Sequence, residues 1–152
     1  MKNYLIMLEQ IKRDEGFSST PYRCPADKWT IGYGSTYLWH TRRFTPVFPH
    51  TLPINRYQAE MHLVLGVNKA IKGAGEFVTN FDDLTPIRQC VLTMMAYQLG
   101  NSGLKKFKKT KRFIEAGNWK AAAVEMLDSK WARQTYKRAE RTADIFYRNK
   151  WQ

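Results

Sequence analysis

The sequence predicts an α+β fold, with an N-terminal helix, a small β-rich lobe and then a mainly helical lobe. Five of the six prolines fall between residues 17 and 53, among short runs in which apolar and polar residues alternate. From residue 55 onward, apolar residues recur at helical spacing, with helix caps between the segments. We expect one domain over 1–152, with the β-rich lobe at about 17–54 and the helical lobe at 1–16 plus 55–152.

The N-terminal segment predicts an amphipathic helix, because Tyr4, Leu8 and Ile11 follow an i, i+4, i+7 pattern. Acidic residues interrupt its apolar stretch, so it is not typical of a signal peptide. Gly16 is a natural helix stop, which places Glu15 at the last helical position.

The β-rich lobe is predicted from the alternation of Trp29, Ile31 and Tyr33 with smaller residues. The segment Pro25-Ala26-Asp27 before it is typical of a hairpin turn. Residues 36–54 carry no pattern that we can place. We expect His40 and His50 there to be surface residues rather than ligands.

The helical lobe begins with a capping-box pattern, Asn55 followed three residues later by Gln58. A second helix opens at Thr85-Pro86 and should end at Gly100. Short helices follow over 107–116, after a cap at Asn118 and after a cap at Thr135. The expected apolar faces are, in the same order, Tyr57, Met61, Val64 and Ile71; Ile87, Val91, Met94 and Met95; Trp119, Ala122, Ala123, Met126 and Leu127; and Ala139, Ala143 and Phe146.

The composition indicates a basic globular protein. Lys plus Arg number 25 against 13 acidic residues, a net charge of +12, which favours polyanionic partners such as nucleic acid, anionic lipid or an acidic cell-wall polymer. No apolar run reaches the ~18 residues of a membrane span. Cys24 and Cys90 have no metal-binding spacing, and we expect two free thiols in a reducing cytosol.

Glu15 is the first candidate for chemistry. Sites favour the junction of two lobes, where we expect a cleft, and Glu15 stands at the hinge between helix and β-rich lobe. The negative end of the helix dipole and partial burial both disfavour an ionised carboxylate, which suits a general acid. A surface glutamate with no task is the alternative at this point.

Ordered motifs through most of the chain resolve that alternative. Glu15-x8-Cys24-x5-Thr30, continuing as Ile31-Gly32-Tyr33-Gly34, resembles the phage-type (T4-like) lysozymes of glycoside hydrolase family 24, which carry Glu-x8-Asp/Cys-x5-Thr and Thr-x-Gly-x-Gly. Three later segments are also similar to that family, namely Tyr97-Gln98-Leu99-Gly100 with Ser102-Gly103, Ser129-Lys130-Trp131 with Gln134-Thr135, and Arg138-Ala139-Glu140-Arg141.

The resemblance implies a lysozyme-like fold with a cleft between the lobes. It also implies a muramidase that hydrolyses the β-1,4 bond between N-acetylmuramic acid and N-acetylglucosamine in peptidoglycan, as phage do to lyse a host. By the same resemblance, Glu15 is the general acid, Cys24 fills a position that is often Asp, and Thr30 places the water or the sugar. Arg138 would orient Glu15, and Gln98 and Gln134 would line the cleft. No cofactor or metal is expected.

Cys24 leaves the mechanism open. Glycoside hydrolysis needs a group on the face opposite the acid, usually a second carboxylate. A thiol could attack as a nucleophile, act as a weak base or order a water, and Arg23 could favour its thiolate. A structural thiol is the alternative. Asp27 could supply a carboxylate, although turn aspartates are usually solvated. Ser35 stands where many relatives carry His.

Three functions compete at this stage: a muramidase, a lytic transglycosylase acting on the same bond, and a basic nucleic-acid-binding helical domain supported by charge alone. For the first, we expect a monomer that binds peptidoglycan and, through its basic surface, anionic polymers or lipids. No specific nucleic acid is expected. The predicted location is the host cytoplasm, with release to the cell wall by a separate pore protein.

Overall fold

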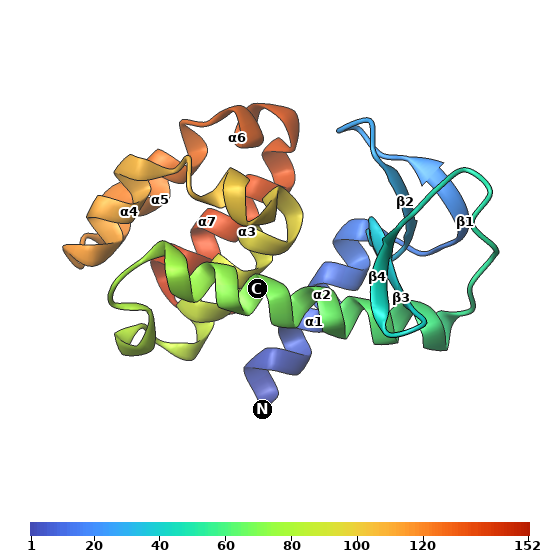
Figure 1. The fold of residues 1–152 in the computed structure, drawn as a ribbon. Coiled ribbons are helices and arrows are strands. Elements are labelled where there is room, and N and C mark those ends of the chain that lie inside the picture. Colours follow the sequence, from blue (N-terminus) through green and yellow to red (C-terminus); the bar gives the residue numbers. More distant parts are fainter. The chain divides into compact units, whose positions relative to one another are not determined.

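The computed structural model describes residues 1–152 and confirms the α+β class, with seven α-helices, one 3₁₀ turn and four short strands (Figure 1). The chain forms two compact units, residues 8–68 and residues 1–7 plus 69–152. Helices α1 (Lys2–Glu15) and α2 (Arg56–Phe77) each contribute residues to both units. No helix is both long and apolar enough to span a membrane.

The predicted hairpin is present in the unit of residues 8–68. Strands β1 (Ser18–Arg23) and β2 (Trp29–Gly32) pair antiparallel, with Tyr22 opposite Thr30 and Arg23 opposite Trp29. The turn closes where the Asp27 amide donates to the Cys24 carbonyl (2.8 Å), and Asp27 has a positive φ of 58°. The turn therefore fixes the register that brings the site residues together.

A second hairpin, β3 (Tyr37–His40) with β4 (Arg43–Pro46), lies in the segment that the sequence left unassigned. Its two-residue turn uses positive φ at Thr41 and Arg42, rather than the Gly, Asn or Asp that usually marks such turns. Trp39 and Phe44 face each other across the strands with ring centroids 5.0 Å apart. His40 and His50 are exposed, as predicted.

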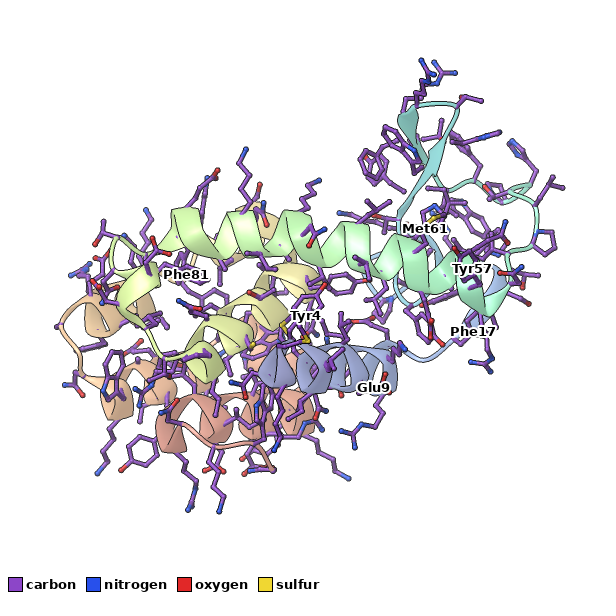
Figure 2. All side chains as sticks on the ribbon, turned by 90° about the horizontal axis from the view of Figure 1, so that it is seen from below. Tyr4, Glu9, Phe17, Tyr57, Met61 and Phe81 are labelled. Carbon is purple, nitrogen blue, oxygen red and sulfur yellow. The ribbon has the colours of Figure 1, made fainter.

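The apolar face predicted for α2 is wrong. Tyr57 is 77% exposed, Met61 42% and Val64 38%. Figure 2 shows where Tyr57 and Met61 lie on the helix. The helix instead buries another face, whose residues at helical spacing are Ala59, Leu63, Val67, Ala70 and Ala74. The predicted capping box is confirmed, since the Gln58 amide donates to Asn55 Oδ1 (2.8 Å) and Gln58 Oε1 accepts from the Asn55 amide (2.9 Å).

The other unit contains the larger helical core. Helix α3 (Pro86–Leu104) begins at Thr85, whose hydroxyl accepts from the Arg88 amide, and leaves helical geometry at Gly100, where φ is 73°. The 3₁₀ turn η1 (Phe81–Asp83) precedes it. Helices α4 (Lys108–Glu115), α5 (Trp119–Leu127), α6 (Lys130–Gln134) and α7 (Tyr136–Arg148) complete the unit. Their core includes Val91, Leu92, Met95, Leu104, Ile114, Met126, Ile145 and Phe146.

The end of this unit departs from the prediction in two details. Helix α6 was not predicted, because five residues are too few to show a period. Thr135 does occupy the position before α7, but its hydroxyl donates to the Trp131 carbonyl (3.0 Å) and does not cap the helix. Asn118 caps α5 as predicted, accepting from the Ala121 amide (3.1 Å).

Candidate functional site

Glu15 is the last residue of α1, as the sequence predicted. The chain reverses direction immediately after it, because Gly16 takes a left-handed φ of 68° and donates its amide to the Lys12 carbonyl (2.9 Å). The Glu15 side chain is half-buried. It points toward the loop that follows β2, where a Cβ built on Gly34 would lie 2.8 Å from Glu15 Oε2.

The two glycines of the Thr-x-Gly-x-Gly motif have separate roles. A Cβ at Gly32 would lie 3.2 Å from the Cβ of Ala59, so Gly32 lets the end of β2 approach α2. A Cβ at Gly34 would meet only the Glu15 side chain among its nearest atoms. Both glycines have positive φ, 65° and 79°. The motif therefore packs the hairpin on one side and makes room for the carboxylate on the other.

Cys24 and Thr30 lie on the same hairpin. Tyr22 is directly opposite Thr30, so their side chains share one face of the sheet. Cys24 follows Tyr22 by two residues and continues that face. Its amide donates to the Lys28 carbonyl (3.0 Å), which extends the pairing by one step. The register thus brings Tyr22, Cys24 and Thr30 together without a long-range contact.

The Cys24 sulfur lies in a small nest of donors. Partial burial is the largest single influence on the pKa of this thiol and raises it. Hydrogen bonds outweigh burial and hold the pKa below its ordinary value; they come from the backbone at Lys28, from the Thr30 side chain, and from the backbone at Ala26 and Cys24 itself. These donors stabilise the thiolate. Cys90 is the opposite case, since burial raises the pKa of its thiol to about 11.

Thr30 connects the sulfur to the strand. It is 2% exposed, and its hydroxyl donates to the Lys28 carbonyl at 2.9 Å. The same hydroxyl lowers the pKa of the Cys24 thiol. A hydroxyl has one proton and rotates freely, so that proton can turn from the carbonyl to the sulfur when the thiolate forms.

Tyr22 is a site residue that the sequence reasoning missed. Burial raises the pKa of its phenol, and the charges of Glu15 and Cys24 raise it further. The charges of both proposed catalytic groups therefore act on this phenol, while its hydroxyl makes no hydrogen bond within the protein. The available signal was the hairpin register, which places residue 22 opposite Thr30 and two residues before Cys24.

The structure does not support the two roles considered from the sequence, Arg23 as the group that favours the Cys24 thiolate and Asp27 as a second carboxylate of the site. The Arg23 guanidinium pairs with Asp27 Oδ1 (3.2 Å) and lies over the Trp29 ring. Hydrogen bonds, rather than this guanidinium, account for the lowered pKa of Cys24. The Asp27 side chain is 81% exposed on the turn, where solvent and Arg23 surround it. Ser35 is buried and closes the loop after β2 through two backbone bonds to Ile31.

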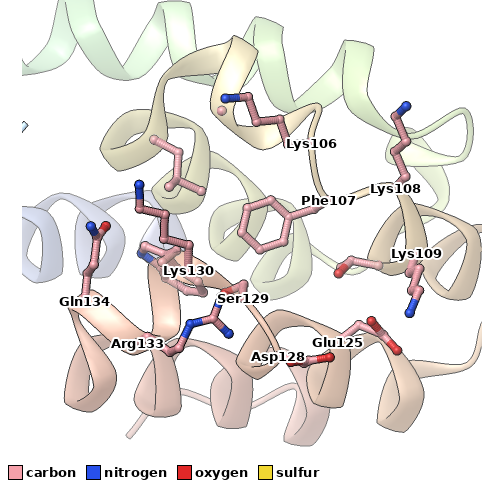
Figure 3. Close-up of a pocket in the computed structure, with 14 residues that line it drawn as sticks. Lys106, Phe107, Lys108, Lys109, Glu125, Asp128, Ser129, Lys130, Arg133 and Gln134 are labelled. Carbon is pink, nitrogen blue, oxygen red and sulfur yellow. The ribbon is translucent and has the colours of Figure 1, made fainter.

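The predicted substrate-binding residues belong to the helical unit, which comprises residues 1–7 plus 69–152. Gln98 Oε1 accepts from the Trp131 indole at 2.8 Å, and Gln134 lines a pocket of about 560 Å³ (Figure 3). Arg138 is half-buried near the start of α7. Glu15, Cys24 and Thr30 form their cluster in the unit of residues 8–68. That these three residues and the predicted substrate-binding residues line one cleft stays a prediction. No three His, Cys, Asp or Glu side chains gather to hold a metal ion.

Comparison with known proteins assigns the family. Residues 12–147 match the family model described as phage lysozyme. The chain is 26% identical to probable T4-type lysozyme 2 of Dictyostelium discoideum over 155 positions, covering 91% of each protein. It is 31% identical to probable T4-type lysozyme 1 of the same organism over 77 residues, or 51% of this chain and 45% of that protein. Because the family model spans most of the sequence, the chain belongs to the phage lysozyme family and is a lysozyme-type glycoside hydrolase with peptidoglycan as its substrate.

Proposed function

We propose that the protein is an endolysin muramidase, which cleaves the β-1,4 bond between N-acetylmuramic acid and N-acetylglucosamine to lyse a host cell. The observation that carries the proposal is the cluster at the first hairpin. A half-buried carboxylate on Glu15 lies against Gly34, while Cys24 and Thr30 share the face of the neighbouring strands. Glycoside hydrolysis needs this combination of an acid and a second polar group.

In the proposed reaction, Glu15 donates its proton to the glycosidic oxygen as the bond from that oxygen to the sugar carbon breaks. Water adds to the same carbon, and its proton is taken up by the protein. If Cys24 takes that proton as a base, a water between Cys24 and the sugar attacks directly. If Cys24 attacks first, a thioglycosyl intermediate forms and Glu15, now ionised, accepts the proton from the water that releases it.

Substitution of Glu15 tests the assignment of the acid. Glu15→Gln should abolish the release of fragments from purified peptidoglycan, because the amide cannot donate the required proton. Glu9→Gln is the matched control on the same helix, since the Glu9 side chain is 65% exposed and pairs only with Lys12. Full activity of Glu15→Gln, with Glu9→Gln also active, would remove Glu15 from this role.

Substitution of Cys24 separates the roles of the sulfur. Cys24→Asp should retain hydrolysis, because it restores the carboxylate that many relatives carry. Cys24→Ser should lose most of it if sulfur attacks or accepts a proton, since a serine hydroxyl does not ionise near neutral pH. A fully active Cys24→Ser enzyme would instead assign the position to water ordering. The anomeric form of the first product distinguishes inversion from retention.

A lytic transglycosylase is the second candidate, and one observation favours it. Asp27 is solvated, so the cluster holds Glu15 and no second carboxylate on the face of Cys24. A transglycosylase also needs one acid, and it releases a 1,6-anhydro sugar rather than a reducing end. Chromatography of the muropeptides before and after borohydride reduction decides between the two, because only the reducing end reacts.

We further propose that the enzyme is held in the host cytoplasm until a pore protein lets it reach the wall. The support is its pair of free cysteines, since a working Cys24 thiol must stay reduced. Expression in a bacterial host should lyse cells only when a pore-forming protein is also made. Lysis without a pore protein would contradict this route and leave the muramidase assignment unaffected.

A further inference from the structure

The pocket is lined by residues of the helical unit, whereas Glu15, Cys24 and Thr30, the hairpin cluster, belong to the unit of residues 8–68. It opens between the segment that leads into α4 and the segment that joins α5 to α6. Phe107 and Trp131 form its aromatic wall, with ring centroids 6.1 Å apart in an edge-to-face arrangement. Trp131 is 5% exposed whereas Phe107 is half-buried, so Phe107 is the ring that a ligand can cover. Figure 3 shows that ring projecting toward Ser129 and Lys130.

The pocket carries an excess of positive charge. Five of its lining residues are cationic and two are acidic, which leaves an excess of three positive charges. All five cations are exposed, and none has a carboxylate oxygen within 4.0 Å. Unpaired like charges around one concavity repel each other, so a bound anion stabilises the arrangement. The cations are Lys106, Lys108, Lys109, Lys130 and Arg133, and the acids are Glu125 and Asp128.

Two of the cations lie beside the aromatic wall. In Figure 3, Lys106 and Lys130 lie on either side of the Phe107 ring, while Glu125 and Asp128 come from the C-terminal end of α5. The start of α4 adds to the positive side, because Phe107 at its N-cap offers no capping oxygen to the first amides. An anionic ligand is therefore expected beside the aromatic ring, away from the two carboxylates.

We propose that this pocket binds a phosphorylated sugar. The volume of about 560 Å³ falls within the range of small-molecule sites. Ammonium and guanidinium groups bind phosphate oxygens in charge-assisted hydrogen bonds, and a phosphomonoester carries between one and two negative charges near neutral pH. The apolar face of a sugar ring can cover the exposed face of Phe107, which removes apolar surface from water. A lone carboxylate would match the excess charge less well.

The proposal concerns a ligand other than the scissile glycan. Two components of cell envelopes carry the required group: the phosphorylated glucosamine head of outer-membrane lipid and phosphate-bearing wall polymers. Either would hold the enzyme at the envelope through the helical unit, while the hairpin cluster acts on the sugar strand. This anchor is independent of the proposed chemistry at Glu15.

A titration followed by the nuclear magnetic resonance signal of the Trp131 indole N–H tests the site directly. N-acetylglucosamine 1-phosphate should bind at least ten times more tightly than N-acetylglucosamine or inorganic phosphate. Lys106→Gln/Lys130→Gln should weaken that binding at least tenfold. Lys120→Gln/Lys137→Gln removes the same charge from exposed positions outside the pocket and should leave binding unchanged. Equal binding of inorganic phosphate, or equal loss in both double variants, would overturn the proposal.

Two pairs of matched surfaces distinguish the two sources of the sugar phosphate. Vesicles of phosphatidylcholine with lipid A are compared with vesicles of equal charge made with phosphatidylglycerol. Wall sacculi with phosphate-bearing polymers are compared with stripped sacculi. Binding that depends on Lys106 and Lys130 in one pair identifies the source, and dependence in neither pair overturns the proposal. Peptidoglycan hydrolysis by the wild type, measured alongside, reports on the muramidase assignment separately.

Discussion

The backbone of Gly34 lies directly against the carboxylate of Glu15, so that a Cβ at residue 34 would stand 2.8 Å from Oε2 and 3.0 Å from Cδ. Glu15 is the last residue of α1 and Gly34 follows β2, so the contact joins a helix end to the loop after a strand. The second glycine of the motif is thus part of the site, because it decides where the proposed acid can lie.

Gly34→Ala should reduce hydrolysis strongly by displacing Glu15. Two effects combine, a steric conflict with the carboxylate and a strained positive φ of 79°. The strain alone costs about 1 to 2 kcal/mol of the free energy of unfolding. The measurement is kcat on purified peptidoglycan together with the urea midpoint.

Gly16→Ala is the matched control for Gly34→Ala. Gly16 has a similar φ of 68°, but a Cβ there would meet no atom within 4 Å. It should lose similar stability and keep most of its activity at a temperature where it is folded. Equal activity losses in the two variants would show that strain, and not the position of Glu15, controls the rate.

The Cys24 thiol should react with iodoacetamide faster than an ordinary cysteine near neutral pH. Its pKa is lowered by hydrogen bonds, so a larger fraction is thiolate, whereas burial raises the pKa of Cys90 to about 11. Thr30→Val removes one of those hydrogen bonds and should move the pH profile of alkylation to higher pH. Mass spectrometry of the two cysteine peptides measures both rates, and faster labelling of Cys90 would contradict the prediction.

Tyr22→Phe should lower kcat by about tenfold with little change in stability, an order of magnitude typical of one lost hydrogen bond in a site. The charges of Glu15 and Cys24 act on this phenol, which has no hydrogen-bond partner in the protein, so its hydroxyl is available to the sugar or to water. Tyr37→Phe on the exposed second hairpin is the control. An unchanged kcat in Tyr22→Phe would show that the hydroxyl takes no part in the reaction and that the ring only packs.

Arg88→Ala should destabilise the helical unit by about 2 to 3 kcal/mol, the effect of losing hydrogen bonds from a buried charge. Its guanidinium donates to the carbonyls of Phe146 (3.1 Å) and Tyr147 (3.4 Å) and lies 4.1 Å from the Trp119 ring centroid. These bonds tie α3 to the end of α7. Urea unfolding measures the loss, and exposed Arg112→Ala should cause a much smaller one.

The sequence was most informative where a local pattern determines local structure. Gly16, the turn at Asp27 and the caps at Thr85 and Asn118 all act within a few residues, and each is present as predicted. The predicted face of α2 was wrong because Tyr57 was taken as a core residue, whereas the buried face carries alanines together with Leu63 and Val67, and two apolar patterns fit the same helix. Tyr22 was missed because its importance depends on strand register, which sequence spacing alone did not fix.

Arg138→Ala tests whether the helical unit completes the site around Glu15. If the guanidinium orients the Glu15 carboxylate through a charge-assisted hydrogen bond, its loss should lower kcat on purified peptidoglycan, because the acid is then no longer held toward the glycosidic oxygen. Arg112→Ala, which changes an exposed arginine of the same unit outside the pocket, is the control. An unchanged kcat in Arg138→Ala would show that this arginine takes no part in the reaction and that the hairpin cluster acts without it.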